Sequence, residues 1–173
     1  MELEVLGWPP DGPRLRLDHE RFAYAGKFVM TNTGKAVARE EGDLVAAVAF
    51  NADRTDERAL WLRYVTVGRG RRGEGLGPRL CDFVAERAVD REFELVRIAV
   101  NNLFAYEALY KAGFGFTGET TGIAELVLER PGDRSRERYR AGLDRFRERD
   151  LSPEEREFLA DRPDADPPAV SKY

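Results

Sequence analysis

The sequence predicts a mixed α/β (α+β) fold in which helices cover a mostly antiparallel sheet. Three observations support this fold class. Several β-favouring runs follow one another in the first 70 residues. A glycine-rich turn then leads from a β-favouring run into an amphipathic helix and a further β-favouring run. Two closing strands follow a second helix, which gives the order β, α, β-β-β, α, β, α, β-β.

The first seventy residues hold one helical run and four β-favouring runs. The helical run is 18–28, where Asp18 can cap the helix and Phe22, Ala25 and Phe28 form a partial apolar stripe. Residues 1–8 end at a Pro-Pro pair and are therefore expected at a sheet edge. The other strands are predicted at 35–40, 44–50 and 60–67, with a hairpin turn at 41–43.

The next sixty residues predict two helices and three strands. Leu76, Leu80 and Val84 recur at helical spacing, so a helix is expected from about residue 76 to 91. A second helix is expected at 102–112, where Gly113 is a typical stop. Strands are predicted at 93–100, 114–119 and 123–130.

The composition changes after Pro131, so we divide the chain into a domain at 1–131 and a charged helical extension with a tail at 132–173. Residues 134–149 hold seven Arg and three acids, a net +4, whereas 150–166 hold seven acids and two Arg, a net −5. Tyr139, Leu143 and Phe146 give the first segment an apolar face. Ser152 and Pro153 mark the start of a further helix. The last ten residues are expected to form a loose tail.

Composition excludes several classes of protein. The hydrophobic share of 42% in 173 residues is enough to bury a core, which argues against disorder. A net charge of −4 disfavours a globally basic nucleic-acid binder. One Cys and one His rule out an internal disulfide and a Cys/His zinc cluster, and no metal is expected. No run approaches the roughly 18 apolar residues that span a bilayer, and the start does not resemble a signal peptide, so a cytoplasmic protein without a membrane partner is expected.

The strongest functional signal is the turn at 68–78, which has five glycines in eleven residues. Such a turn before a helix directs several backbone N–H groups and the positive end of the helix dipole at one point. Arg69, Arg71, Arg72 and Arg79 against Glu74 give a local charge of +3. The turn therefore favours an anionic ligand that carries phosphate.

Residues 68–73 formally match the dinucleotide pattern GxGxxG, which would imply a nicotinamide-dependent oxidoreductase. In that frame Gly75, Gly77 and Pro78 would lie inside the helix, where each Gly costs about 1 kcal/mol and a Pro about 3 kcal/mol. The helix is instead expected to start near Leu76 to Pro78, because Pro is tolerated in a first turn. The GxxxxGK[ST] phosphate loop is absent.

Two motifs together resemble the GNAT superfamily of N-acetyltransferases. Arg72-x-x-Gly75-x-Gly77 before a helix is similar to its acyl-CoA pyrophosphate signature. The second motif follows about 25 residues later, and the resemblance covers roughly residues 35–130. This second motif consists of Asn102, Ala105, Leu109-Tyr110 and Gly113-Phe114.

The resemblance implies a GNAT-like acyl-CoA N-acyltransferase fold with a central, splayed parallel strand pair, here 60–67 and 93–100. It implies that acetyl-CoA is the co-substrate, that a backbone N–H near Val67 polarises the thioester carbonyl, and that Tyr110 is the general acid for the leaving thiolate. Asn102 could serve as a helix cap, as a pantetheine contact, or as both. The resemblance assigns cofactor binding to Val65, Thr66, Val67, Arg72, Gly73, Glu74, Gly75, Leu76, Gly77, Pro78, Asn102 and Ala105.

The sequence departs from the family pattern at the general base. Many members carry a Glu on the strand before the turn, but 61–63 reads Trp-Leu-Arg. Asp56, Glu57 and Glu119 are the alternative carboxylates; a water chain or an amine of low pKa would also serve. Trp61 could line an acceptor pocket or belong to the core.

We therefore expect an N-acetyltransferase that moves an acetyl group from acetyl-CoA to a primary amine by direct attack in a ternary complex. An acyl-enzyme on Cys81 is disfavoured, because the only His lies far away in sequence at His19. The alternative function is a non-catalytic acyl-CoA-binding or interaction module. The extension at 132–173 could bind RNA, cover the acceptor cleft or mediate homodimerisation, but a docked, solvated helix is the simpler interpretation.

Overall fold

The computed structural model describes residues 1–162 and 165–171. The chain forms two compact units, Met1–Arg97 and Ile98–Tyr173. The strands form a seven-stranded sheet in the order β1-β2-β3-β4-β5-β7-β6, and strand β5 (Leu95–Val100) lies across the boundary between the units. The sheet is mixed, with one parallel pair and otherwise antiparallel neighbours. The α/β fold class that the sequence predicts is therefore confirmed.

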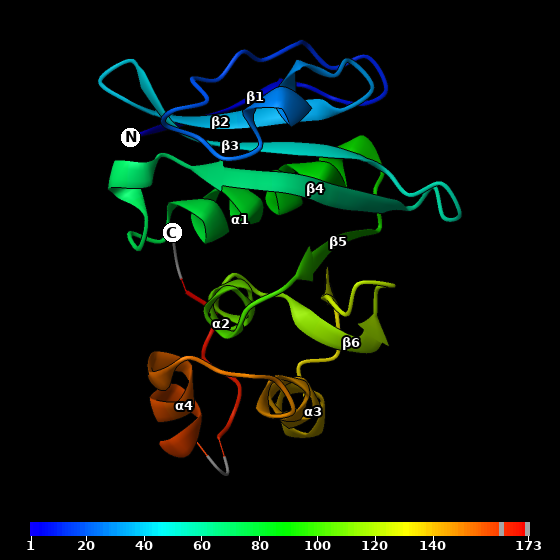
Figure 1. Ribbon diagram of the computed structural model, residues 1–173. Helices are drawn as coiled ribbons and strands as arrows, with labels where there is room; N and C mark the ends of the chain where they lie inside the picture. The colour runs from blue at the N-terminus through cyan, green and yellow to red at the C-terminus, as the bar shows by residue number, and fades with distance from the viewer. Residues whose placement is uncertain (163–164, 172–173) are drawn as a thin grey trace. The chain divides into compact units, whose positions relative to one another are not determined.

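The first unit is built on four consecutive antiparallel strands (Figure 1). Strand β1 lies at the edge of the sheet, as the Pro-Pro pair after it predicts. The β2–β3 hairpin closes through Glu41 and Gly42, whose φ angles of 53° and 86° suit the tight turn that the right-handed strand twist requires. The elements are β1 (Glu2–Gly7), η1 (Ala25–Val29), β2 (Gly34–Glu40), β3 (Asp43–Ala52), β4 (Ala59–Val67), η2 (Arg69–Arg71), α1 (Leu76–Ala88) and η3 (Val89–Arg91).

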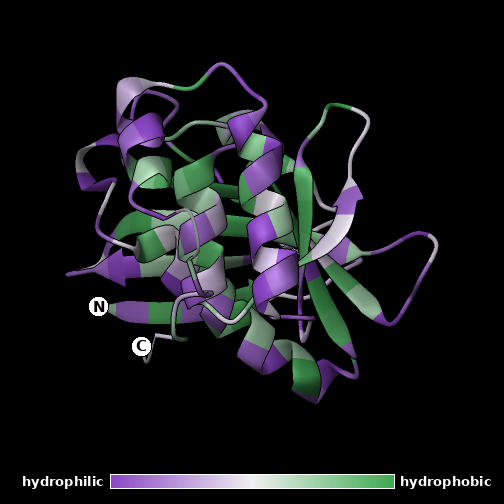
Figure 2. Cartoon of the chain, turned by 90° about the horizontal axis from the view of Figure 1, so that it is seen from below, coloured by the Kyte–Doolittle hydropathy of each residue, from purple (hydrophilic) through white to green (hydrophobic). Residues whose placement is uncertain are grey.

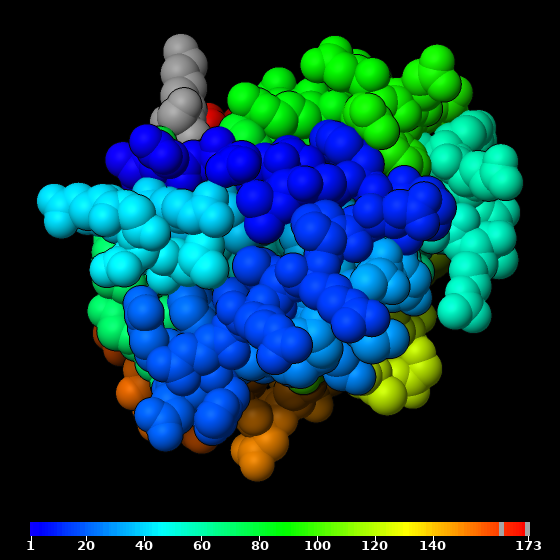
Figure 3. All heavy atoms as spheres, turned by 90° about the horizontal axis from the view of Figure 1, so that it is seen from above, coloured from blue at the N-terminus to red at the C-terminus, as the bar shows by residue number. Residues whose placement is uncertain are grey.

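The sheet of the first unit is covered on both faces. Helix α1 packs against β2, β3 and β4. On the opposite face Phe28, Val37, Ala47 and Ala49 form a buried cluster, joined by residues of the N-terminal segment such as Leu15. Figure 3 shows this segment, in blue, spread over that face. Residues on β4 are therefore directed either toward α1 or toward the N-terminal segment.

The helix predicted at 18–28 is wrong. The structure has only turns after Asp18 and the short 3₁₀ helix η1 in this region. The Asp18 carboxylate accepts the backbone N–H of Glu20, and Tyr24 adopts a left-handed conformation with φ 62°. A left-handed residue interrupts an α-helix, because the backbone N–H and C=O groups around it no longer align along one axis.

The second unit holds two strands and three helices beside the end of β5. Side-chain caps begin all three helices, since Asn102, Ser135 and Ser152 each accept a backbone N–H of the first turn. Helix α4 has a complete capping box between Ser152 and Glu155. The elements are α2 (Leu103–Lys111), β6 (Gly115–Thr120), β7 (Leu126–Arg130), α3 (Arg136–Arg147) and α4 (Pro153–Ala160).

Aromatic side chains form the core of the second unit. Tyr106 lies 4.9 Å from Tyr110 and 5.8 Å from Tyr139 between ring centroids, and Phe116 and Phe146 contact Tyr106 edge-on. The Tyr106 hydroxyl donates to the Tyr139 carbonyl oxygen at 2.8 Å, and the Tyr139 hydroxyl donates to the buried Glu107 carboxylate. Helix α3 is thus docked by the apolar face that the sequence predicts.

The described part of the tail is more ordered than expected. Arg134 donates to the Pro168 carbonyl oxygen at 2.8 Å, and Ser171 donates its backbone N–H to the Lys111 carbonyl oxygen at 2.7 Å. Arg136 and Asp166 form an ion pair at 2.5 Å, so the basic and acidic segments do pair at this point. The division at residue 131 stays a prediction from composition.

The helices carry hydrophobic and hydrophilic residues together (Figure 2), as expected of helices with one face on a core. Within the described ranges, no helix combines the length and the apolar character needed to cross a bilayer.

Gly142→Ala tests the packing of α2 against α3. A Cβ at residue 142 would collide with the Tyr106 ring and its hydroxyl. We expect the free energy of unfolding to fall by about 1–3 kcal/mol, because overpacking outweighs the better helix propensity of Ala. Gly122→Ala is the control, since nothing lies within 4 Å of the position of its Cβ. The free energy of unfolding would be measured by urea denaturation. A Gly142→Ala variant at least as stable as the native protein would contradict the close packing of Tyr106 against Gly142.

Candidate functional site

The glycine-rich turn lies at the end of β4 and is fixed to its neighbours in the first unit. Gly68 donates its N–H to the Val45 carbonyl oxygen at 2.9 Å, and Arg69 donates its N–H to the Arg21 carbonyl oxygen at 2.9 Å. The short helix η2 follows these two anchors. The turn is therefore held at its first residues, and its later residues lead into α1.

Helix α1 begins at Leu76, as the placement of Gly and Pro predicts. Gly75 precedes it in a left-handed conformation with φ 77° and offers no side-chain cap. The Arg79 N–H makes a first-turn bond, to the Gly75 carbonyl oxygen at 3.1 Å, and Pro78 has no N–H. The N–H groups of Leu76 and Gly77 thus belong to the helix end that has no intrahelical acceptor.

The backbone of the turn is open to a ligand. Gly73 and Gly75 both have positive φ, and apart from their chain neighbours no described residue comes within 4 Å of where their Cβ atoms would be. Glycine removes both the backbone strain and the side chain that would keep a bulky anion away. Gly77 instead packs against β4. A Cβ at Gly77 would lie 3.5 Å from Val65 Cγ1 and 3.6 Å from Val67 Cγ2.

Two of the four arginines of the turn are neutralised or bound internally. Arg71 forms ion pairs with Glu40 at 2.6 Å and with Glu74 at 3.0 Å, and these carboxylates raise the pKa of its guanidinium. Arg69 donates to the carbonyl oxygens of His19 and Glu20. These two side chains tie the turn to β2 and to the N-terminal segment, and they are not available to a ligand.

The other two arginines remain available. Arg72 is exposed and makes no ion pair with any described residue. The Nε of Arg79 is buried and has no hydrogen-bond partner among the described residues. A buried donor without an acceptor costs about 1–3 kcal/mol, so an anion that accepts from Arg79 would recover this free energy. Arg79 was not among the site residues expected from the sequence, because burial of its Nε cannot be read from sequence.

The predicted residues on β4 point to opposite faces. Val65 and Val67 pair with Val48 and Ala46 and direct their side chains to the start of α1. Thr66 pairs with Ala47 on the other face, and its Oγ1 is buried without a partner in the described part of the chain. Glu74, another predicted contact, directs its carboxylate to Arg71. The structure thus brings residues 65–67 and 72–78 together within the first unit.

In the second unit, Asn102 is the N-cap of α2. Its Oδ1 accepts the Ala105 N–H at 2.8 Å, which confirms the capping role. The contact of Asn102 and Ala105 with a cofactor stays a prediction.

Tyr110 lies in the aromatic core of the second unit. Its side chain is fully buried, and its hydroxyl oxygen accepts the Phe116 backbone N–H at 2.8 Å. The Arg134 guanidinium lies 5.1 Å from the ring centroid. Burial raises the pKa of the hydroxyl, so it gives up its proton less readily. These contacts give Tyr110 a structural role, and the acid role that the resemblance implies stays a prediction.

Strand β4 has a bulge at Arg63. The adjacent β3 residues Ala49 and Phe50 pair with Tyr64 and Leu62, which leaves Arg63 without a partner in the register. Trp61 donates its indole N–H to the Asp53 carboxylate, and Arg97 donates to the same carboxylate at 3.1 Å. The segment that lacks the family's usual carboxylate therefore presents a cation and an anchored indole ring.

The candidate bases differ in their surroundings. Asp56 accepts from Arg58 at 3.0 Å, and this hydrogen bond keeps the pKa of its carboxyl below the usual range. A lowered pKa makes Asp56 a weaker base. Glu57 and Glu119 are exposed, on the loop after β3 and on β6 respectively.

The model of the acetyltransferase (GNAT) family matches residues 2–116. The fold is similar to that of an IAA acetyltransferase from Bacillus cereus ATCC 14579, with a TM-score of 0.55 and 16% identity over 74% of this chain and 97% of that chain. None of the curated proteins matches the chain in sequence.

Two further solved structures match over a shorter part of the chain. A ribosomal-protein-alanine N-acetyltransferase from Brucella melitensis has a TM-score of 0.50 and 21% identity over 57% of this chain and 68% of that chain. A nourseothricin acetyltransferase has a TM-score of 0.49 and 24% identity over 56% of this chain and 64% of that chain. This chain thus spans about two thirds of the length of these two proteins.

Cys81 gives a simple test of the site's chemistry. It is fully buried in α1, and burial raises the pKa of its thiol to about 12. We expect no reaction with a thiol reagent at pH 8 in the native protein and complete reaction in denaturant, because the thiolate is the reactive form. Fast labelling of the folded protein, or an acetyl group trapped on Cys81, would contradict the interpretation of Cys81 as a buried, unreactive thiol.

Proposed function

The chain belongs to the GNAT acetyltransferase family, and on that premise we propose that it is an N-acetyltransferase that uses acetyl-CoA to acetylate a primary amine. The observation that carries this proposal is the open turn before α1. Among the described residues, it combines helix N–H groups without a side-chain cap, an exposed Arg72 and a buried Arg79 Nε without a hydrogen-bond partner.

This arrangement fits the pyrophosphate of an acyl-CoA. A pyrophosphate offers several acceptor oxygens and negative charge, which match the N–H groups at a helix start and two guanidinium groups. Gly73 and Gly75 leave room for it beside the backbone. Arg72, Arg79 and the N–H groups of 75–77 would hold this group, and Val65 to Val67 would hold the pantetheine arm by backbone hydrogen bonds.

The proposed reaction is a direct transfer in a ternary complex. The amine nitrogen forms a bond to the acetyl carbon, and the bond from that carbon to sulfur breaks. The nitrogen loses one proton, and the thiolate takes one up, so that an amide and free CoA result. A backbone N–H near Val67 would stabilise the oxyanion that forms on the carbonyl oxygen. We assign no residue as the base, since Asp56 is weakened by Arg58 and the alternatives are exposed.

The second candidate is a non-catalytic acyl-CoA-binding module. It is favoured by the burial of the Tyr110 hydroxyl and by the absence of a carboxylate at 61–63. Both candidates bind acetyl-CoA. Only the enzyme releases free CoA faster when an amine is added, so a thiol-release assay separates them.

Calorimetric titration with acetyl-CoA tests the turn. We expect micromolar binding by the native protein and at least a tenfold loss in Gly75→Glu, which puts a carboxylate where the pyrophosphate would approach. The control is Gly42→Glu, because Gly42 also has a positive φ of 86° and open space around it. This variant therefore has the same backbone strain and the same added charge, but at the β2–β3 turn.

Three results would count against the proposal. A folded native protein that does not bind acetyl-CoA would overturn it. Equal losses in the two glycine variants would show that strain or net charge, and not the position of Gly75, is responsible. Full binding by Gly75→Glu would place the pyrophosphate elsewhere.

Tyr110→Phe separates the two roles of Tyr110. An acid would contribute about 10²–10⁴-fold to kcat. The geometry favours the structural role, so we expect kcat to stay close to the native value. The free energy of unfolding should fall by about 1–3 kcal/mol, because the Phe116 N–H loses its acceptor. A hundredfold fall in kcat with unchanged stability would instead establish Tyr110 as the acid.

A further inference from the structure

Arg63 is a cation held on β4 in a defined position. The bulge leaves it outside the strand pairing, and its Nε donates to the Asn51 Oδ1 at 2.7 Å. Its guanidinium carbon lies 4.9 Å from the centroid of the Trp61 ring. Asn51 and Trp61 are paired across β3 and β4, so the three side chains share one face of the sheet. This face is opposite α1 and is the one on which Tyr64 joins the cluster of Phe28.

The nearest carboxylate is occupied by other donors. Asp53 accepts from the Trp61 indole N–H, from Arg97 and from both the N–H and the hydroxyl of Thr55. No carboxylate of the described residues forms an ion pair with Arg63. Asp53 thus positions the Trp61 ring that supports Arg63, and its charge acts on Arg63 as well as on Arg97, with which it forms the ion pair.

The side of the guanidinium that remains free is suited to an anion. Within the described residues, Asn51 accepts only the Nε–H of Arg63, which leaves the N–H donors of the two terminal nitrogen atoms in a planar fork. Such a fork binds a carboxylate through two parallel hydrogen bonds. Stacking on Trp61 and the bond to Asn51 fix the orientation of the fork before a ligand arrives. A single guanidinium matches the single charge of a carboxylate better than the double charge of a phosphate monoester.

The position of Arg63 relates this anion site to the proposed reaction. Strand β4 rises about 3.3 Å per residue, so Arg63 lies roughly 7 Å along the strand from Val65 and 13 Å from Val67. We propose that Arg63 binds the carboxylate of the amine acceptor, and that the acceptor is an amino acid whose reacting amine is several bonds from that carboxylate. This inference rests on the proposed function, because it names the acceptor class of the same site.

Two acceptors that differ only in the carboxylate test the proposal. L-Lysine and its decarboxylated analogue, 1,5-diaminopentane, would be compared by kcat/KM at saturating acetyl-CoA. We expect the native protein to prefer L-lysine by at least tenfold. Phosphoethanolamine compared with ethanolamine forms a second pair, and a larger preference there would overturn the choice of carboxylate over phosphate.

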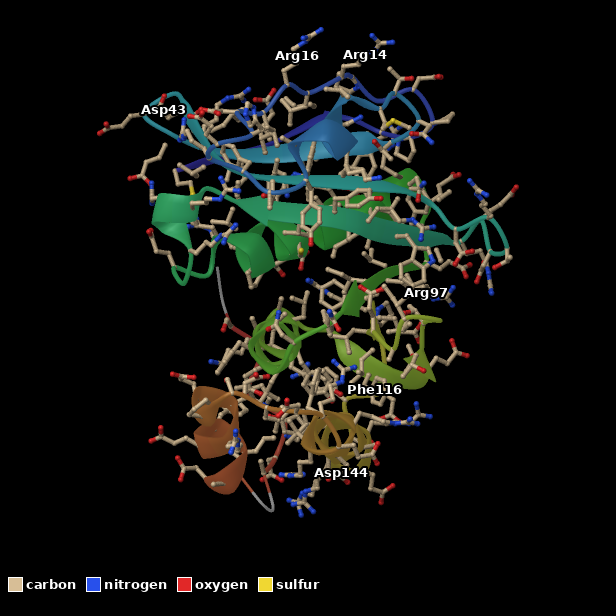
Figure 4. The ribbon with its side chains drawn as sticks, in the orientation of Figure 1. Arg14, Arg16, Asp43, Arg97, Phe116 and Asp144 are labelled. Atoms are coloured by element: carbon tan, nitrogen blue, oxygen red, sulfur yellow. The ribbon has the colours of Figure 1, made fainter. Side chains whose placement is uncertain are left out.

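Four variants assign the preference to the fork. Arg63→Gln removes the cation, and Asn51→Asp places a carboxylate beside it, so both should reduce the preference to about one. Arg63→Lys keeps the charge without the fork and should retain only part of it. Arg16→Gln is the control, because Arg16 is exposed and directed away from the sheet of the first unit (Figure 4). A preference that survives Arg63→Gln would overturn the proposal.

A binding measurement keeps this test independent of catalysis. Hexanoate and hexylammonium would be titrated against the arginine side-chain ¹⁵N resonances, with Arg63 assigned from the Arg63→Gln spectrum. We expect hexanoate to shift the Arg63 signal and hexylammonium to leave it unchanged. A shift without any acetyl-CoA binding would refute the proposed function and retain the carboxylate site. Acetyl-CoA binding without a shift of Arg63 would overturn the inference alone.

Discussion

The start of helix α1 is the constraint on which the site depends. Gly75 adopts φ 77°, a conformation that costs an ordinary residue about 1–2 kcal/mol, and no side chain caps the helix that follows. Each of the helices α2, α3 and α4 is capped by its own Asn or Ser. The first turn of α1 is therefore the helix start that leaves its donors for something other than the chain itself.

The arginines around this turn have two different functions, which depend on whether the protein itself supplies their hydrogen-bond or ion-pair partners. Arg69 and Arg71 use their charge to hold the turn against the N-terminal segment and β2, so the open backbone keeps one shape. Arg79 instead buries its Nε without an acceptor among the described residues, so an anion that accepts from this N–H would recover the cost of its burial. The turn is thus held by side-chain bonds to the N-terminal segment and to β2. At the start of α1, by contrast, it has hydrogen-bond donors without acceptors among the described residues.

Much of the fold could be predicted from sequence because the relevant signals are local. Gly77 and Pro78 limit where α1 can begin, and the pair Glu41–Gly42 closes a hairpin by its backbone preferences alone. The prediction of a helix at 18–28 was wrong because the left-handed conformation of Tyr24 and the turn at Asp18 outweighed a weak apolar stripe.

Less of the site could be predicted from the sequence, because its interactions involve residues that are far apart in the sequence. The sequence assigns a charge of +3 to the turn, but Glu40 neutralises Arg71 from 31 residues away. The bulge at Arg63 depends on the register with β3, which no local pattern reveals. Tyr110 follows Leu109 as the second motif of the family requires. The motif does not reveal that the Tyr110 ring packs against Tyr106 and Tyr139 in an aromatic core.

The most direct test of the central claim compares acetyl-CoA with S-acetylpantetheine, which lacks the pyrophosphate and the nucleotide. Affinities of both ligands would be measured for the native protein, for Arg79→Gln and for Arg72→Gln. If the turn binds the pyrophosphate, each variant weakens acetyl-CoA by about tenfold, the loss of one charge-assisted hydrogen bond, and leaves S-acetylpantetheine unchanged. Equal losses for the two ligands, or no loss for acetyl-CoA, would contradict the account.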